Sequence, residues 1–120
     1  MLNVSVENIG ELAVVECEGR LVQSESAHTL RDAVTSQTGA RIVVVDLSEV
    51  RAMGGVGFCT LVLLRRWARE HNIRFLLFNP SKSVESRLSR SRAIAEFCVP
   101  SFEEMMALLS SANCRYALAA

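Results

Sequence analysis

The residues of this chain that could bind a phosphate are the glycines of Gly54-Gly55-Val56-Gly57. Glycines ahead of a helix leave backbone N–H groups free to attract an anion. The chain contains neither of the two signatures of nucleotide-binding loops, Gly-x-x-x-x-Gly-Lys-Ser/Thr and Gly-x-Gly-x-x-Gly. These glycines therefore indicate a tight turn and a close approach to a neighbouring segment rather than a nucleotide site.

The other polar candidates are a serine, a histidine and three carboxylates. Ser24, His28 and Asp32 would share one face of an expected helix, but a row of side chains along a surface provides no oxyanion hole and no pocket. Asp46 follows an apolar run, and only Glu49 lies near it in the sequence, so we expect it to cap the following turn rather than bind a metal. We predict no catalytic residue, no metal site and no cofactor, and we expect that the chain is not an enzyme.

The cysteines Cys17, Cys59, Cys98 and Cys114 are widely separated. They form no Cys-x-x-Cys pair and have no histidine at zinc-ligand spacing. We expect reduced, mostly buried thiols in a cytoplasmic protein. The sequence does not open with a basic stretch leading into an apolar run, and its longest apolar segment, from Val56 to Leu64, is about half of a membrane span. These features favour a protein that is neither exported nor inserted into a membrane.

Length and charge are those of an ordinary globular domain. The 120 residues suffice for one domain with a real core, and a content of 50% hydrophobic and 22% charged residues excludes a disordered chain. Lysine plus arginine equals aspartate plus glutamate, at 13 each, so no global field favours nucleic acid. The Ser/Arg-rich stretch 81–92 fits a solvated helix face better than an RNA contact, because it contains no aromatic residue.

A strand, a loop and a helix would position the glycines. Ile42 to Val45 are all β-branched, which is typical of a strand covered on both faces, and Asp46 closes the run. From Val56 to Leu64 the chain is apolar apart from Thr60 and continues to Trp67, which favours a helix buried around most of its circumference. The loop between them would lie at the carboxyl edge of the sheet, where partners and ligands usually bind.

Weaker patterns predict the amino-terminal elements and a further strand. Residues 2–7 alternate as in a strand with one exposed face, and residues 12–18 predict a second strand that pairs with it as a hairpin. Ser24 is expected to cap the next helix. The inward residues of that helix would be Ala27, Leu30 and Val34. Residues 74–78 predict a third buried strand, parallel to the central one.

The rest of the chain completes a single domain. Residues 81–90 predict a polar helix, 97–99 a short last strand and 101–104 the capping box of a final helix. The inward residues of that helix would be Phe102, Met105, Met106 and Leu109. We therefore predict an α/β fold with a mixed, mostly parallel sheet of four to five strands and about four helices. The domain would span residues 1–112, and residues 113–120, which have no visible period, would form a mobile tail.

One motif, together with the order of the elements, is similar to a known family. Val45-Asp46-Leu47-Ser48-Glu49-Val50, followed by Gly57 and a leucine-rich helix, resembles the STAS domain of anti-sigma factor antagonists. Bacterial members typically read Asp-Leu-Ser-Gly-Val, three residues, then Asp-Ser-Ser-Gly-Leu. Glu18-Gly19-Arg20-Leu21 is similar to the second strand of the family, and the segment from Arg87-Leu88 to Pro100-Ser101-Phe102-Glu103-Glu104 to its closing part. The resemblance covers roughly residues 1–112.

The chain departs from the family at the residue that carries regulation. In the family, the first serine of Asp-Ser-Ser-Gly accepts a phosphate from a partner kinase that is also the anti-sigma factor. Here the equivalent residues are Gly54-Gly55-Val56-Gly57, with Gly55 at the serine position, and no hydroxyl lies between Glu49 and Cys59. A phosphate there would place about two negative charges at a helix amino end. The sequence therefore predicts no phosphorylation at this loop.

The resemblance implies a protein partner and leaves two functions open. The first is an interaction module in a partner-switching pathway, which binds an anti-sigma factor that is a serine-kinase-like ATPase. The second is a STAS subunit on the cytoplasmic ATPase of an ABC-type lipid or solute transporter. A homodimer also remains open, whereas binding to nucleic acid or insertion into a membrane is not expected. The residues expected to bind the partner are Arg51, Met53, Gly54, Gly55, Val56, Gly57 and Phe58.

Overall fold

The computed structural model describes residues 2–89, 103–108 and 110 of the chain. The elements are, in order, β1 (Leu2–Ile9), β2 (Leu12–Leu21), α1 (Ser24–Thr35), β3 (Ile42–Met53), α2 (Gly55–Glu70), β4 (Arg74–Phe78) and α3 (Lys82–Ser89). A further helical segment covers residues 103–108.

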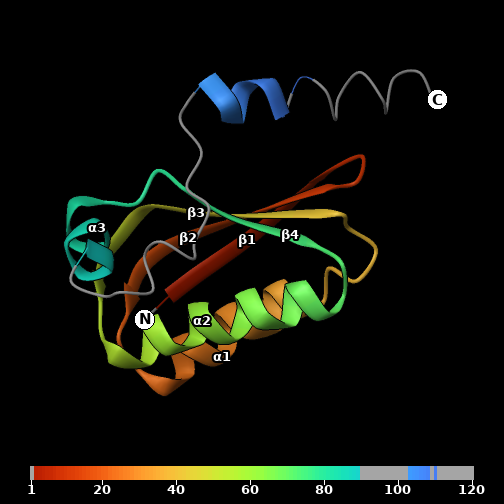
Figure 1. The fold of residues 1–120 in the computed structure, drawn as a ribbon. Helices are drawn as coiled ribbons and strands as arrows, with labels where there is room; N and C mark the ends of the chain where they lie inside the picture. Colours follow the sequence, from red (N-terminus) through yellow and green to blue (C-terminus); the bar gives the residue numbers. More distant parts are fainter. Residues whose placement is uncertain (1, 90–102, 109, 111–120) are drawn as a thin grey trace.

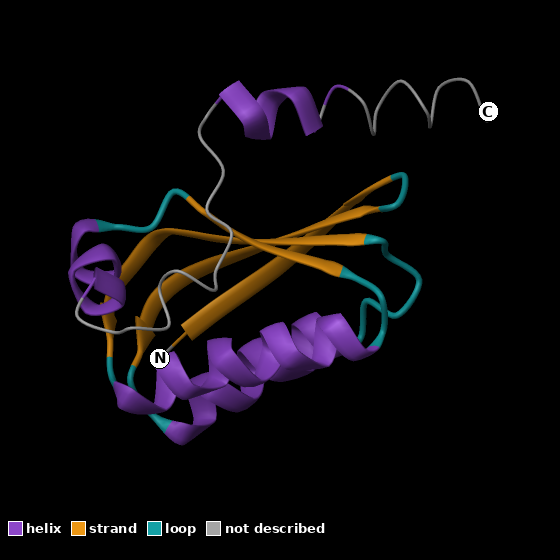
Figure 2. Ribbon diagram, viewed as in Figure 1, coloured by secondary structure: helices purple, strands orange, loops and turns teal. Residues whose placement is uncertain are grey.

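The strands form one mixed sheet in the order β1-β2-β3-β4. β1 pairs with β2 in the antiparallel sense, and β2, β3 and β4 run parallel to one another. Helices α1 and α2 lie on one side of this sheet, and the helical segment 103–108 lies on the other (Figure 1; Figure 2). The predicted α/β fold with a mixed, mostly parallel sheet is confirmed.

β3 is covered on both faces, as its apolar run predicts. Val43 and Val45 are fully buried in the larger core cluster, which contains residues of the sheet and of helices α1 and α2. Val44 belongs to a second cluster, which contains Leu76 of β4 and Met105 of the last helical segment. Because both faces are covered, the strand carries no alternation of polar and apolar residues here.

β3 runs well past the apolar segment that predicts it. The expectation that Asp46 closes the strand is wrong, because β2 and β3 stay paired as far as Leu21 and Met53. The hydrogen bonds of such a ladder satisfy the backbone of polar residues as well as that of apolar ones. The loop predicted between strand and helix therefore shrinks to Gly54, the residue that precedes α2.

An irregularity in the pairing of β2 with β3 explains the role of Asp46. Glu16 pairs with Asp46 and Glu18 with Glu49, so the register shifts by one residue between these pairs. Such a shift is a β-bulge, which leaves one residue out of the ladder. The Asp46 carboxylate accepts a hydrogen bond from the backbone N–H of Ser48 at 2.9 Å. The capping role predicted for Asp46 is therefore found, but inside a strand instead of a turn.

The two long helices differ from prediction in detail. Gln23, with an extended backbone and no side-chain hydrogen bond, precedes α1, so the prediction that Ser24 caps this helix is wrong: Ser24 already lies in its first turn. The buried residues of α1 are Ser26, Leu30 and Val34, a regular spacing of four. Ala27 is partly buried and lies beside α2.

α2 is less buried than its apolar sequence predicts. Its buried residues are Gly57, Thr60, Leu61, Leu64 and Ala68. By contrast, Val56 is 44% exposed and Leu63 is 58% exposed. The expectation of a helix buried around most of its circumference is therefore wrong. An unbroken apolar run does not reveal which side of a helix meets the core.

Some predictions lie outside the described residues. They concern the short strand 97–99, Cys98, Ser101 and Phe102, Leu109, the domain boundary at residue 112, Cys114 and the tail 113–120. In the last helical segment Met105 is buried, whereas Met106 is 46% exposed. Met105 therefore takes the inward position that was predicted for both methionines, and for Met106 the prediction is wrong.

Candidate docking site at the start of helix α2

Backbone hydrogen bonds hold the corner between β3 and α2 in place. The Gly54 N–H donates to the Leu21 carbonyl at the end of β2 at 3.1 Å. The Phe58 N–H donates to the Gly54 carbonyl at 3.0 Å, which closes the first turn of α2. The corner thus lies at the carboxyl edge of the parallel strands, the edge at which the sequence predicts a binding site (Figure 1).

The residues predicted to bind a partner divide into accessible and buried ones. The accessible or partly accessible ones are Arg51, Gly54, Gly55, Val56 and Phe58. We call these residues the docking edge. Met53 and Gly57 are buried beneath it, so they can support the edge but cannot offer a side chain to a partner.

Gly57 is the glycine that the packing requires. A Cβ atom at this position would lie 2.5 Å from the Leu21 carbonyl oxygen and 2.9 Å from the Met53 Cγ. Non-bonded carbon atoms prefer separations of about 3.5–4.0 Å, so even a methyl group would force the neighbouring segments apart. The close approach predicted for the glycines is therefore confirmed at Gly57.

Gly55 has space that Gly57 lacks. The nearest neighbour of a Cβ atom at Gly55 would be the Arg87 Nη2 atom, at a comfortable 3.5 Å. The fold thus admits a side chain at Gly55, and packing does not explain the missing hydroxyl. Arg87 comes from α3, and the sequence does not predict its place beside α2. Because Arg87 and Gly55 are far apart in the sequence, no local sequence pattern predicts their contact.

Two arginines lie at or beside the docking edge. Arg51 is exposed at the end of β3, and the Arg87 guanidinium lies beside Gly55. The first turn of α2 contains no acidic residue, so no side chain within it offsets the positive end of the helix dipole. A surface that carries carboxylates would complement this charge.

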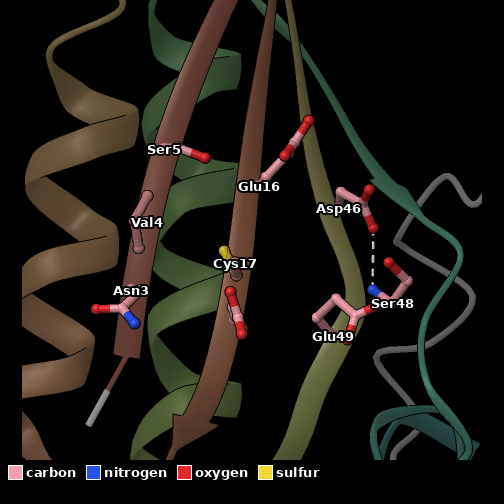
Figure 3. A pocket seen from close by; sticks show the side chains of 9 residues that line it. Asn3, Val4, Ser5, Glu16, Cys17, Asp46, Ser48 and Glu49 are labelled. Atoms are coloured by element: carbon pink, nitrogen blue, oxygen red, sulfur yellow. Dashed lines mark hydrogen bonds between the residues drawn. The ribbon is translucent and has the colours of Figure 1, made fainter.

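A shallow concavity of about 160 Å³ lies over strands β1, β2 and β3 (Figure 3). Its acidic side chains are Glu16, Glu18, Asp46 and Glu49. Figure 3 shows the Asp46 carboxylate turned toward the Ser48 N–H, which is the hydrogen bond of the bulge. Within the described ranges, no group of three or more His, Cys, Asp or Glu side chains could hold a metal ion.

The row of Ser24, His28 and Asp32 lies along an exposed side of α1. All three residues are exposed, and the Asp32 carboxylate lies 3.9 Å from the Arg31 Nε. An open row of this kind does not enclose a substrate. The arrangement is thus the one expected from the sequence, in which these side chains follow one another along a surface.

The two cysteines of the described chain lie in different environments. Both are free thiols, Cys17 buried and Cys59 exposed, so the expectation of mostly buried thiols holds for Cys17 and not for Cys59. Burial raises the pKa of the Cys17 thiol from 9.0 to about 12, and the nearby Asp46 carboxylate adds to the shift. A thiol of this kind remains protonated at neutral pH.

We expect an alkylating reagent near pH 8 to modify Cys59 much faster than Cys17, because the thiolate is the nucleophile. Timed alkylation followed by peptide mass mapping would measure both rates. Between about pH 9 and pH 12 the folded protein keeps the Cys17 proton that the unfolded chain releases, so the free energy of unfolding should fall as pH rises. Cys17→Ala should reduce that slope. Equal alkylation rates in the folded protein would contradict the burial of Cys17.

No helix among the residues that the structure describes is long and apolar enough to cross a membrane.

A family model described as STAS domain matches residues 3–105. Among curated proteins, none matches the sequence significantly.

Several solved structures share the fold. SpoIIAA, an anti-sigma factor antagonist in its unphosphorylated form, is 15% identical with a TM-score of 0.74, and the match covers 91% of this chain and 97% of that one. An anti-sigma factor antagonist from Mycobacterium paratuberculosis is 18% identical with a TM-score of 0.76, over 92% and 95% of the two chains. Mglu is 25% identical with a TM-score of 0.59, over 65% of this chain and 20% of that one, so this chain spans about a fifth of its length.

Proposed function

The chain belongs to the STAS domain family, and we propose from this that it is a non-catalytic, cytoplasmic module of a partner-switching pathway, similar to an anti-sigma factor antagonist. Its partner would be an anti-sigma factor of the serine-kinase-like ATPase class. The observation that carries the proposal is the docking edge, which is accessible, contains one charged side chain, that of Arg51, and contains no hydroxyl group.

The missing hydroxyl determines how such a module would be controlled. Gly55 occupies the position at which the family carries its phosphoacceptor serine. A phosphate there would add about two negative charges to the positive end of α2 and reverse the charge of the edge. With glycine at this position the edge keeps its charge, so the partner is bound constitutively or released through another site.

The nearest hydroxyl groups do not offer a substitute. Thr60 is 8% exposed, and its hydroxyl donates a hydrogen bond to the Val56 carbonyl at 2.8 Å. Ser48 is partly buried and lines the concavity over the strands, away from the docking edge. Neither hydroxyl group is therefore well placed to accept a phosphate at the docking edge. This favours partner binding that is not controlled by a kinase.

The same missing hydroxyl favours one alternative. A STAS subunit on the cytoplasmic ATPase of an ABC-type lipid or solute transporter needs no phosphorylation cycle. Such a subunit would keep its docking edge covered by the ATPase permanently. The two proposals thus share the surface and differ in the class of the bound ATPase.

The experiment is capture of the partner from native cells with the full chain as bait. We expect a kinase-like ATPase, and we expect Val56→Asp to weaken its binding at least tenfold, or about 1.4 kcal/mol, because a carboxylate replaces an apolar contact. Met106→Asp is the matched control, since Met106 is 46% exposed and Val56 is 44% exposed, and it should bind like the wild type. Incubation with the captured kinase and ATP should leave the mass of the chain unchanged.

Other outcomes decide against the proposal. Recovery of an ABC-type ATPase by the wild type, with loss in Val56→Asp, would select the transporter subunit. Equal binding by Val56→Asp and Met106→Asp would show that the docking edge is not the contact. Thermal unfolding of both variants shows whether each remains folded, and we expect midpoints close to that of the wild type.

A further inference from the structure

A groove of about 350 Å³ lies between α1 and α2, beyond the docking edge. Its α2 wall is an apolar stripe of Val56, Leu63 and Trp67, which lie seven and four residues apart and thus on one side of the helix. Val56 and Leu63 are 44% and 58% exposed. The stripe extends over about three helical turns, a length that suits contact with another helix.

The groove is already shaped for an apolar contact. The Thr60 hydroxyl, at its floor, is satisfied by the Val56 carbonyl at 2.8 Å, so covering the floor would leave no polar group of this side chain unpaired. The Trp67 ring stacks on the His71 ring with centroids 4.7 Å apart. This stacking holds the aromatic wall in one orientation.

The opposite wall carries basic side chains. His28 and Arg31 of α1 line the groove, and its lining includes no aspartate or glutamate. The Arg31 Nε lies 3.9 Å from the Asp32 carboxylate, and both side chains are more than half exposed. Such a loose surface pair contributes little, so the Arg31 guanidinium remains available to a carboxylate of a partner.

We propose that this groove binds an amphipathic helix of the partner protein, about three turns long, with apolar residues on one face and carboxylates along its margin. An apolar stripe beside a basic rim is complementary to such a helix. The groove is continuous with the docking edge through Val56, which belongs to both. The inference rests on the proposed function in one respect, since the helix would belong to the same partner.

A second copy of this chain fits the groove less well. A symmetric pair would use the same patch on both copies. It would therefore bring two basic rims together with no carboxylate of the lining to offset them. Like charges across an interface oppose association, and the charge pattern favours a different, acidic partner.

The test uses two designed helical peptides with identical leucine faces, one with glutamates and one with lysines along the margin. Trp67 is the single tryptophan of the chain, so its fluorescence reports directly on the groove. We expect the glutamate peptide to shift the emission in a saturable way and to bind at least tenfold more tightly than the lysine peptide. Equal binding of both peptides, or no saturable shift, would overturn the inference.

Two groove variants and two controls sharpen the result. Leu63→Asp should weaken binding of the glutamate peptide at least tenfold. Arg31→Glu should reverse the preference, so that the lysine peptide binds more tightly than the glutamate peptide. Val6→Asp and Met106→Asp, at residues outside the groove lining, should leave the affinity for the glutamate peptide unchanged. Self-association in sedimentation that Leu63→Asp abolishes would assign the groove to a second copy and overturn the inference.

The two proposals can fail separately. Partner capture that is lost in Gly55→Glu but kept in Leu63→Asp would uphold the docking edge and reject the groove as a contact with that partner. Peptide binding in the groove, combined with capture of no ATPase, would reject the proposed function while leaving the chemistry of the groove intact.

Discussion

A Val44→Asp variant will not fold. Val44 is fully buried in β3 and packs in one cluster with Leu12, Leu76 and Met105, so the carboxylate would be enclosed by apolar side chains. Burying an unpaired charge costs several kcal/mol, and the lost packing of the valine adds about 1–2 kcal/mol. The sum is comparable with the whole stability of a small domain, about 5–15 kcal/mol. We expect no cooperative thermal transition by circular dichroism.

Val6→Asp provides the control for this prediction. It makes the same chemical change in the edge strand β1, where Val6 is 37% exposed. A partly hydrated carboxylate keeps most of its solvation, so we expect a cost below about 1 kcal/mol. If Val44→Asp instead unfolds cooperatively near the wild-type midpoint, then the last helical segment does not cover this face of the sheet.

The second large effect on stability is expected for Gly57→Ala. The added methyl group would lie 2.5 Å from the Leu21 carbonyl oxygen, so the start of α2 must move away from the end of β2. Overpacking of this kind costs about 1–3 kcal/mol, and the obstacle here is a backbone atom, which cannot rotate aside. We expect a lower urea midpoint with an unchanged slope of the transition.

Gly55→Ala is the matched comparison two positions earlier. Its methyl group would meet only the end of the Arg87 side chain, at 3.5 Å. Alanine is also the better helix former, by about 1 kcal/mol within a helix, so we expect a small gain or no change. Gly57→Ala should therefore lower the midpoint and Gly55→Ala should not, and a similar loss in both would contradict the distinction between these glycines.

α2 carries the features from which both interaction proposals start. Its buried side completes the core, its first turn forms part of the docking edge, and its exposed stripe lines the groove. A partner that engaged both surfaces would bury the exposed side chains of Val56 and Leu63 together. Large exposed apolar side chains grouped on one surface commonly mark such contacts.

Strand β3 could be predicted from the sequence because a strand that is buried on both faces consists of consecutive apolar residues. The β-branched run Ile42 to Val45 predicts a strand covered on both faces, and the structure confirms it. The continuation of that strand to Met53 was not predictable in the same way. Its polar residues are held by pairing with β2 and by the Asp46 carboxylate at the bulge, and neither partner adjoins them in the sequence.

The amino-acid sequence alone is enough to establish the order of the elements, the family and the absence of a hydroxyl group at the docking edge. These depend on residue types and on spacing along the chain, which can be read without coordinates. The packing of the folded chain is needed to show that Gly57 must be glycine whereas Gly55 need not be, that Arg87 lies beside α2, and that α1 and α2 form a groove. Each of these depends on the distance between segments remote in sequence, which packing sets and local patterns do not record.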